Sequence, residues 1–126
     1  MLRIIIADDH PVLLQAVKKM IQEEFPNAEI GEALNASALL EKVFKQEWDL
    51  VITDMAMPGG GGFMALKKIK QFNKNLPVLI ISTYPAEQYR NNAIKAGAED
   101  FISKEVFPGE LVSAIHRIVD KISPAK

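Results

Sequence analysis

The sequence contains no cysteine, so disulfides, thiol nucleophiles and cysteine-liganded zinc sites are excluded. It also lacks an excess of charge of either sign, because 15 Lys and Arg stand against 16 Asp and Glu, for a formal net charge of -1. This balance argues against binding to nucleic acid through its phosphate backbone, which normally requires a large basic excess. No apolar run reaches the roughly 18 residues that a membrane span needs, and the N-terminus has no signal-peptide pattern. The chain is therefore expected in a reducing, aqueous compartment, without membrane contact.

The length of 126 residues corresponds to one domain. A chain of this size can bury roughly two-thirds of the surface exposed by its unfolded form, so a hydrophobic core needs no covalent support. The periodic pattern ends near Ile122. We therefore expect a domain over residues 1–122, followed by a tail or the start of a linker over residues 123–126.

Short apolar runs alternate with longer segments of helical periodicity. The runs cover residues 2–7, 28–33, 50–53, 78–82 and 100–103. The first, third and fourth are nearly continuous stretches of Ile, Leu and Val, as expected for strands that are covered on both faces. These three runs are predicted to be the central strands of a parallel sheet.

The intervening segments place apolar residues at helical spacing. Pro11 suits the first turn of a helix, Asn35 is a candidate N-cap, a further helix is expected from Pro85 to just before the C-cap glycine Gly97, and the last helix is expected over residues 108–122. The predicted inner faces are Val12, Ala16, Val17, Met20 and Ile21; Leu39, Leu40, Val43 and Phe44; Phe63, Leu66, Ile69 and Phe72; and Leu111, Ile115, Ile118 and Ile122. The pattern predicts an α/β fold of the (βα)5 type, doubly wound, with helices on both faces of the sheet.

Polar residues follow the predicted strands where those strands end. Asp8 and Asp9 follow the first strand, Asp54 the third, Ser82 ends the fourth, and Lys104 follows the fifth. The carboxyl ends of parallel strands share one edge, so these side chains are expected to converge there. Three carboxylates would repel one another without a hard cation such as Mg²⁺, and a lysine and a hydroxyl nearby complete a site for a phosphoryl group.

These residues also carry a family resemblance. The sequence Asp-Asp-His-Pro over residues 8–11, Asp54-Met55 with Pro58-Gly59 and Gly62-Phe63 behind it, Ser82-Thr83, and Lys104 together resemble the receiver domain of bacterial two-component response regulators. The resemblance covers the whole chain. The first motif, and the acidic Glu105 where the family commonly has proline, look most like the NarL/LuxR-type subgroup. The implied fold is flavodoxin-like, with strand order 2-1-3-4-5.

The resemblance implies a role for each matching position. Asp54 would accept the phosphoryl group from a phosphohistidine of a sensor histidine kinase. Asp9 would bind Mg²⁺ (or Mn²⁺) directly, Asp8 mostly through water, and the backbone carbonyl of Ala56 would complete the protein's ligands together with Asp54. Lys104 would pair with Asp54 at rest and with the phosphoryl oxygens afterwards. Ser82 would bind the phosphoryl group, Phe101 would be the aromatic switch residue, and Ala56 and Tyr84 would tune the rate of dephosphorylation.

The resemblance further implies a signalling protein of the cytoplasm, not an enzyme in the usual sense. The readout surface would be the fourth helix, fifth strand and fifth helix. Transcription would be controlled through a helix-turn-helix DNA-binding domain absent from this sequence, with phosphorylation promoting a homodimer. A stand-alone or non-phosphorylated receiver acting as a protein-protein interaction module is the alternative.

Other interpretations of the same residues fit the sequence less well. A phosphatase with an aspartyl-phosphate intermediate would need a second acid where Ala56 stands, and a flavin carrier would need a first loop that does not repel phosphate, unlike Asp8-Asp9. Residues 59–62 are all glycine but lack the Gly-Lys-Ser/Thr of a phosphate-binding loop. His10 is interpreted as a capping or surface histidine, His116 as polar surface, and Phe101 equally as plain core packing.

Overall fold

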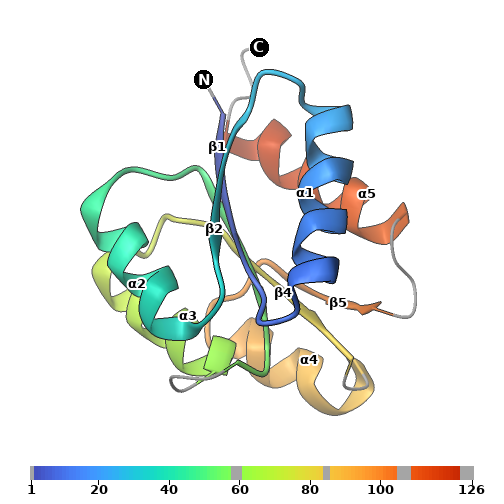
Figure 1. The fold of residues 1–126 in the computed structure, drawn as a ribbon. Coiled ribbons are helices and arrows are strands. Elements are labelled where there is room, and N and C mark those ends of the chain that lie inside the picture. Colours follow the sequence, from blue (N-terminus) through green and yellow to red (C-terminus); the bar gives the residue numbers. More distant parts are fainter. Residues whose placement is uncertain (1, 58–60, 84–85, 105–108, 123–126) are drawn as a thin grey trace.

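Parallel strands form the centre of the computed structural model, which describes residues 2–57, 61–83, 86–104 and 109–122 (Figure 1). Within these ranges the sheet has five strands in the order β2-β1-β3-β4-β5. The strands are β1 (Arg3–Ala7), β2 (Glu29–Ala33), β3 (Leu50–Asp54), β4 (Val78–Ser82) and β5 (Asp100–Ser103). The predicted (βα)5 architecture and strand order are confirmed, and β1, β3 and β4 are the three inner strands.

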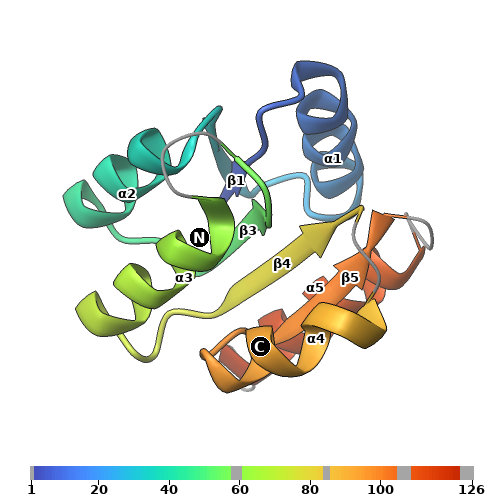
Figure 2. The ribbon, with the colours of Figure 1, turned by 90° about the horizontal axis from the view of Figure 1, so that it is seen from below.

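The helices of the described residues cover both faces of this sheet (Figure 2). They are α1 (Pro11–Glu24), α2 (Ala36–Lys45), α3 (Gly61–Phe72), α4 (Ala86–Lys95) and α5 (Gly109–Ile122). Successive side chains of a strand point to opposite faces, so Ile4 and Ile6 pack with α1 and α5, while Ile5 packs with α2, α3 and α4. Two hydrophobic clusters result, one on each side of the sheet. No described helix has both the length and the apolar character needed to cross a membrane.

Two predicted helix ends are confirmed by their geometry. The Asn35 side chain accepts a hydrogen bond from the amide of Ala38 at 2.7 Å, which is the N-cap bond expected at the start of α2. Gly97, two residues after the end of α4, has a φ of 112°, and this left-handed conformation favours glycine. The predicted starts at Pro85 and Pro108 lie outside the described residues.

Part of the predicted inner face of α1 is wrong. Val12 is 87% exposed and Ala16 is also exposed, whereas Leu14, Val17 and Ile21 are buried. Steps of three and four from Leu14 define the buried stripe, and Val12 and Ala16 lie on the flank of the helix outside it. The apolar spacing in this segment was compatible with more than one rotation of the helix.

Two aromatic side chains predicted to face inwards lie instead at the surface. Phe44 and Phe72 are 46% and 57% exposed, in the last turns of α2 and α3. Their ring centroids lie 4.8 Å apart, so each ring covers part of the other. This pair links the ends of two neighbouring helices without reaching the core.

Candidate functional site

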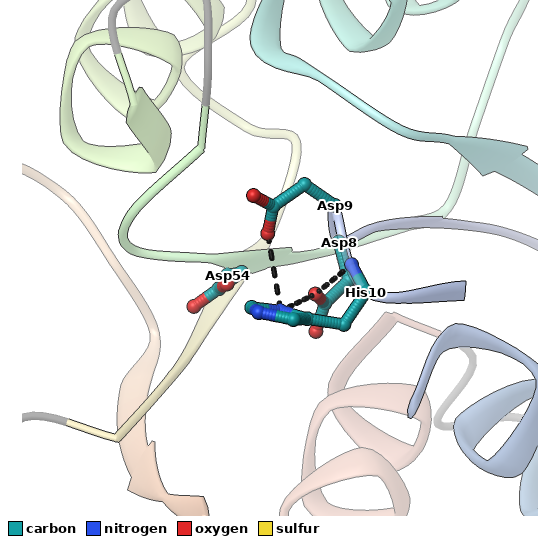
Figure 3. Close-up of side chains that lie close together, drawn as sticks. All are labelled: Asp8, Asp9, His10 and Asp54. Atoms are coloured by element: carbon teal, nitrogen blue, oxygen red, sulfur yellow. Dashed lines mark hydrogen bonds and ion pairs between the residues drawn. The ribbon is translucent and has the colours of Figure 1, made fainter. Parts of the chain in front are cut away.

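The predicted acids meet at the carboxyl edge of the sheet. In the parallel pairing of β1 with β3, Ala7 lies opposite Thr53, so Asp8 follows β1 at the level where Asp54 ends β3. Asp8 is fully buried and Asp54 is 4% exposed. Figure 3 shows both carboxylates beside those of Asp9 and the ring of His10. The structure thus brings the three predicted carboxylates together.

The turn after β1 is defined by its own side chains. The Asp8 carboxylate accepts a hydrogen bond from the backbone amide of His10 at 2.9 Å, as aspartate commonly does two residues ahead of itself. Pro11 restricts the residue before it to extended conformations, and His10 has φ -104° and ψ 102°. These two constraints place the side chains of residues 8–10 over the end of the sheet, where α1 begins.

Lys104 reaches the same cluster from the end of β5. Its Nζ atom lies 3.2 Å from Oδ2 of Asp8 and 3.4 Å from Oδ2 of Asp54. Its side chain is only 11% exposed, so water screens these interactions weakly. We expected a pair between Lys104 and Asp54, and the structure has the ammonium shared between Asp54 and Asp8.

Burial dominates the electrostatics of Asp54. Loss of solvent raises the pKa of its carboxyl group above the ordinary value, the positive charge of Lys104 opposes this shift, and the negative charge of Asp8 adds to it. A single ammonium therefore does not compensate for two buried carboxylates. A further positive charge at this point would stabilise the ionised form of Asp54.

Asp9 provides the observation that fits a cation. Its Oδ1 atom is buried and, among the described residues, has no hydrogen-bond partner. The Nδ1 atom of His10 approaches it to 3.1 Å, but without the direction of a hydrogen bond. Oxygen atoms of Asp8, Asp9 and Asp54 and a nitrogen of His10 lie within 4.8 Å of one another, and oxygen donors are what Mg²⁺ prefers. The residues present therefore fit a divalent cation.

The remaining predicted site residues, where they are described, lie on β4 and β5 or just after β3. Ser82 ends β4 and is fully buried, while Ala56 is exposed just after β3. Phe101 is 1% exposed and belongs to the cluster that packs with α2, α3 and α4. Tyr84 and Glu105 lie outside the described residues, as do Pro58 and Gly59.

Two features near the site were not predicted. His10 is exposed, as predicted for a surface histidine, but its imidazole does not cap α1 and lies against the carboxylates, with Nδ1 3.0 Å from Oδ1 of Asp8. A Cβ atom at Gly62 would overlap the backbone carbonyl of Asp54, so α3 passes very close to the end of β3. The spacing Asp-x-His-Pro could have indicated the first feature. The second depends on a tertiary contact that the sequence does not contain.

A third feature lies at the opposite end of β5. The buried carboxylate of Asp100 is paired with Arg90 of α4 at 2.7 Å and with Arg117 of α5 at 3.0 Å. Arg90 also donates a hydrogen bond to the backbone carbonyl of Phe101 at 3.3 Å. These bonds join α4, β5 and α5, the three elements that form the expected readout surface.

Comparison with known proteins agrees with this arrangement. The family model described as the response regulator receiver domain matches residues 4–116. The nitrate/nitrite response regulator protein NarL of Escherichia coli is 30% identical over 114 residues, which are 90% of this chain and 53% of NarL. The chemotaxis protein CheY of Thermotoga maritima is 31% identical over 116 residues, which are 92% of this chain and 96% of CheY.

Solved structures give the same result. The response regulator TrrA of Thermotoga maritima superimposes with a TM-score of 0.84 and 30% sequence identity, over 94% of this chain and 99% of TrrA. The chain spans about half the length of NarL and of several other curated relatives. The similarity to NarL supports the NarL/LuxR-type subgroup. This chain belongs to the family of response regulator receiver domains.

Proposed function

We propose that Asp54 accepts a phosphoryl group from a phosphohistidine of a sensor histidine kinase and that this modification switches the α4-β5-α5 surface. The observation that carries the proposal is the position of Asp54, which is buried at the carboxyl edge of the sheet beside Asp8 and Lys104. A buried carboxylate with a raised pKa beside one ammonium destabilises the fold, so stability does not explain its presence. Its placement is suited to chemistry on that carboxylate.

Asp8, Asp9, Asp54 and the backbone carbonyl of Ala56 would hold Mg²⁺ or Mn²⁺ at this site, with Asp8 acting mostly through water. The bound cation supplies neutralisation of the negative phosphoryl oxygens as they approach the carboxylates. The buried and unpartnered Oδ1 atom of Asp9 supports this donor set. The similarity to TrrA, which was solved in complex with Mg²⁺ and BeF, supports it independently.

The phosphoryl transfer needs no reactant other than the kinase phosphohistidine and the Asp54 carboxylate. An oxygen of the Asp54 carboxylate forms a bond to phosphorus while the bond from phosphorus to the kinase imidazole nitrogen breaks, and the imidazole leaves with the electron pair. Lys104 is positioned between Asp8 and Asp54, so its ammonium can pair with a phosphoryl oxygen after a small movement. Positioning and charge neutralisation are the main requirements of phosphoryl transfer.

The switch follows from the charge that is added. Phosphorylation adds about -1.5 to -2 charges and three strong hydrogen-bond acceptors. The hydroxyl of Ser82 and the ammonium of Lys104 would bind these acceptors and favour the active arrangement of their loops. Phe101, whose backbone is held by Arg90 of α4, would change its packing and carry the shift to the readout surface.

The downstream function of the receiver is inferred from the known proteins that it resembles. We propose that this receiver acts in the cytoplasm, that phosphorylation favours a homodimer, and that a helix-turn-helix DNA-binding domain outside this sequence controls transcription. The similarity to NarL, of which this chain matches about half, supports this output. A stand-alone receiver that works through protein contacts is the second candidate, and the similarity to CheY over 96% of the length of CheY favours it.

The residue two positions after the phosphoacceptor suggests slow dephosphorylation. Ala56 is exposed and has no side-chain group to orient an attacking water. We expect that Ala56→Asn, which adds an amide at this position, shortens the lifetime of the phosphorylated protein relative to wild type. Tyr84, which lies outside the described residues, would partly shield the phosphoryl group.

The test is phosphorylation by a small donor in place of the kinase. Wild-type protein incubated with phosphoramidate or acetyl phosphate and Mg²⁺ is expected to gain the mass of one phosphoryl group by intact mass spectrometry. Asp54→Asn and wild-type protein in EDTA are the matched controls and should stay unmodified. An unchanged mass of folded wild-type protein would contradict the proposal and favour the interaction module.

A further inference from the structure

His10 occupies the first position before α1, yet it does not cap this helix. Its side chain makes no hydrogen bond to the amides of α1. The ring instead turns back over the end of the sheet and lies between the carboxylates of Asp8 and Asp9 (Figure 3). Its backbone is held in this orientation by the bond from the His10 amide to Asp8 and by the restriction that Pro11 imposes.

The distances between the donor atoms match those around a metal ion. Nδ1 of His10 lies 3.0 Å from Oδ1 of Asp8 and 3.1 Å from Oδ1 of Asp9. In octahedral coordination with bonds of about 2.1 Å, neighbouring ligand atoms are separated by about 3 Å. Nδ1 of His10 and Oδ1 of Asp9 therefore already have the separation of adjacent ligands, and Oδ1 of Asp8 lies beside them.

The hydrogen bonds of the cluster do not account for all of these contacts. The Nδ1 atom carries at most one hydrogen, so it can make a well-directed hydrogen bond to only one oxygen. Its direction suits Oδ1 of Asp8. Oδ1 of Asp9 stays buried without a hydrogen bond, although it is almost as close. A cation bound directly by Nδ1 of His10 and Oδ1 of Asp9, with Asp8 reaching it mostly through water, would satisfy the Oδ1 atom of Asp9 that the imidazole leaves without a hydrogen bond.

We infer that His10 is a further ligand of the metal site, through Nδ1, and that this nitrogen makes the site favour Mn²⁺ over Mg²⁺. The inference rests on the proposed metal-dependent function of the same site. Mg²⁺ prefers oxygen ligands only, whereas first-row transition metals accept imidazole readily. The phosphorylation of Asp54 would then depend on which divalent ion is available.

Direct detection of the His10 nitrogen bound to Mn²⁺ is the sharpest test. The sequence contains two histidines, so His116 provides a matched control. His116 lies on α5 with Nε2 3.0 Å from Glu24, away from the acidic cluster. Pulsed electron paramagnetic resonance of bound Mn²⁺ would be recorded for wild type, His10→Ala and His116→Ala. Dissociation constants for Mn²⁺ and Mg²⁺ would be measured by calorimetry on the same three proteins.

Wild type and His116→Ala are expected to show the modulation of a directly bound imidazole nitrogen, and His10→Ala is expected to lose it. His10→Ala should weaken Mn²⁺ binding about tenfold or more and Mg²⁺ binding less than about threefold. Bound Mn²⁺ without the nitrogen signal in wild type, or unchanged Mn²⁺ affinity in His10→Ala, would overturn the role of His10 and leave the proposed function intact. Absence of any binding of either ion would instead contradict the metal-dependent function and the inference with it.

Discussion

The ammonium of Lys104 lies 3.4 Å from the carboxylate of Asp54, and it reaches this position from the end of β5, two strands away in the sheet. Lys104 follows β5 and Asp54 ends β3, so the contact exists only once β3, β4 and β5 have paired. Because the same ammonium also contacts Asp8, it is shared between two buried acids. The stability of the metal-free protein and the reactivity of Asp54 therefore depend on the same three charges.

Replacement of Lys104 by methionine should destabilise the metal-free protein. The variant keeps most of the aliphatic side chain but leaves two buried carboxylates without their shared cation, at an expected cost of about 3 kcal/mol. Loss of Lys104 also raises the pKa of Asp54 further, so the cost should be largest at neutral pH and fall as acidification protonates Asp54. Urea denaturation in EDTA at several pH values measures this. Lys121→Met, which removes an exposed lysine paired with Glu99 at 3.5 Å, should have little effect.

Asp54→Asn is expected to stabilise the metal-free protein. The folded state raises the pKa of Asp54, so its ionised form is less favourable there than in the unfolded chain. The resulting penalty is absent at low pH, grows as the pH rises from the unfolded pKa to the raised folded pKa, and stays constant above that window. The asparagine variant removes it, and at neutral pH we expect a gain of roughly 1 kcal/mol, or a few degrees in Tm.

Thermal denaturation of Asp54→Asn and wild type in EDTA, from acidic to neutral pH, tests whether the variant is the more stable protein. The two curves should converge at low pH and separate as the pH increases. A variant that is equally or less stable at neutral pH would show that the Lys104 pair outweighs the burial of Asp54.

Gly62→Ala should disturb both the fold and the phosphoacceptor. The added Cβ would overlap the backbone carbonyl of Asp54 and crowd the Cα of Met55, and these backbone atoms cannot move aside as a flexible side chain can. We expect a loss of about 1 to 3 kcal/mol in the free energy of unfolding and changed amide chemical shifts around Asp54. Gly109→Ala is the matched control, because nothing lies within 4 Å of a Cβ there. Equal stability of the two variants would show that the backbone approach at Gly62 is not rigid.

Removal of the Asp100 charge should destabilise the protein less than removal of the charges of Arg90 and Arg117. Asp100 is 8% exposed, whereas the side chains of Arg90 and Arg117 are 49% and 62% exposed. In Asp100→Asn both guanidinium groups can turn into water, at a cost of about 1 kcal/mol. The double variant Arg90→Gln/Arg117→Gln leaves a buried carboxylate without a cation and should cost about 2 kcal/mol or more. Urea denaturation that finds the single variant less stable than the double would contradict this order.

The inner strands of the sheet and much of the site at its carboxyl edge could be predicted from local sequence patterns. Continuous apolar runs predict buried strands because such a strand needs apolar side chains on both faces, and this identified β1, β3 and β4. Asn35 and Gly97 mark helix ends because each satisfies a local backbone requirement. Asp8, Asp54 and Lys104 converge because parallel strands end at one edge.

Other features depend on packing that no local pattern specifies. The rotation of α1, which exposes Val12, is decided by how it meets β1 and α5, and the pairing of Phe44 with Phe72 depends on how far α2 and α3 extend along the sheet. The direction of the His10 ring depends on two carboxylates attracting it more than the first turn of α1 does. The contacts of Gly62 and of Asp100 join segments distant in sequence, so they become visible only in the structure.

The proposed function requires that Asp54 itself carries the phosphoryl group. Borohydride reduces an acyl phosphate to an alcohol, which converts a phosphorylated aspartate into homoserine at the modified position. Wild-type protein would be phosphorylated with phosphoramidate and Mg²⁺, reduced, digested and mapped by tandem mass spectrometry. We predict homoserine at position 54 and none in EDTA. Homoserine at position 8 or 9, or unmodified aspartate at all three positions, would contradict phosphorylation of Asp54.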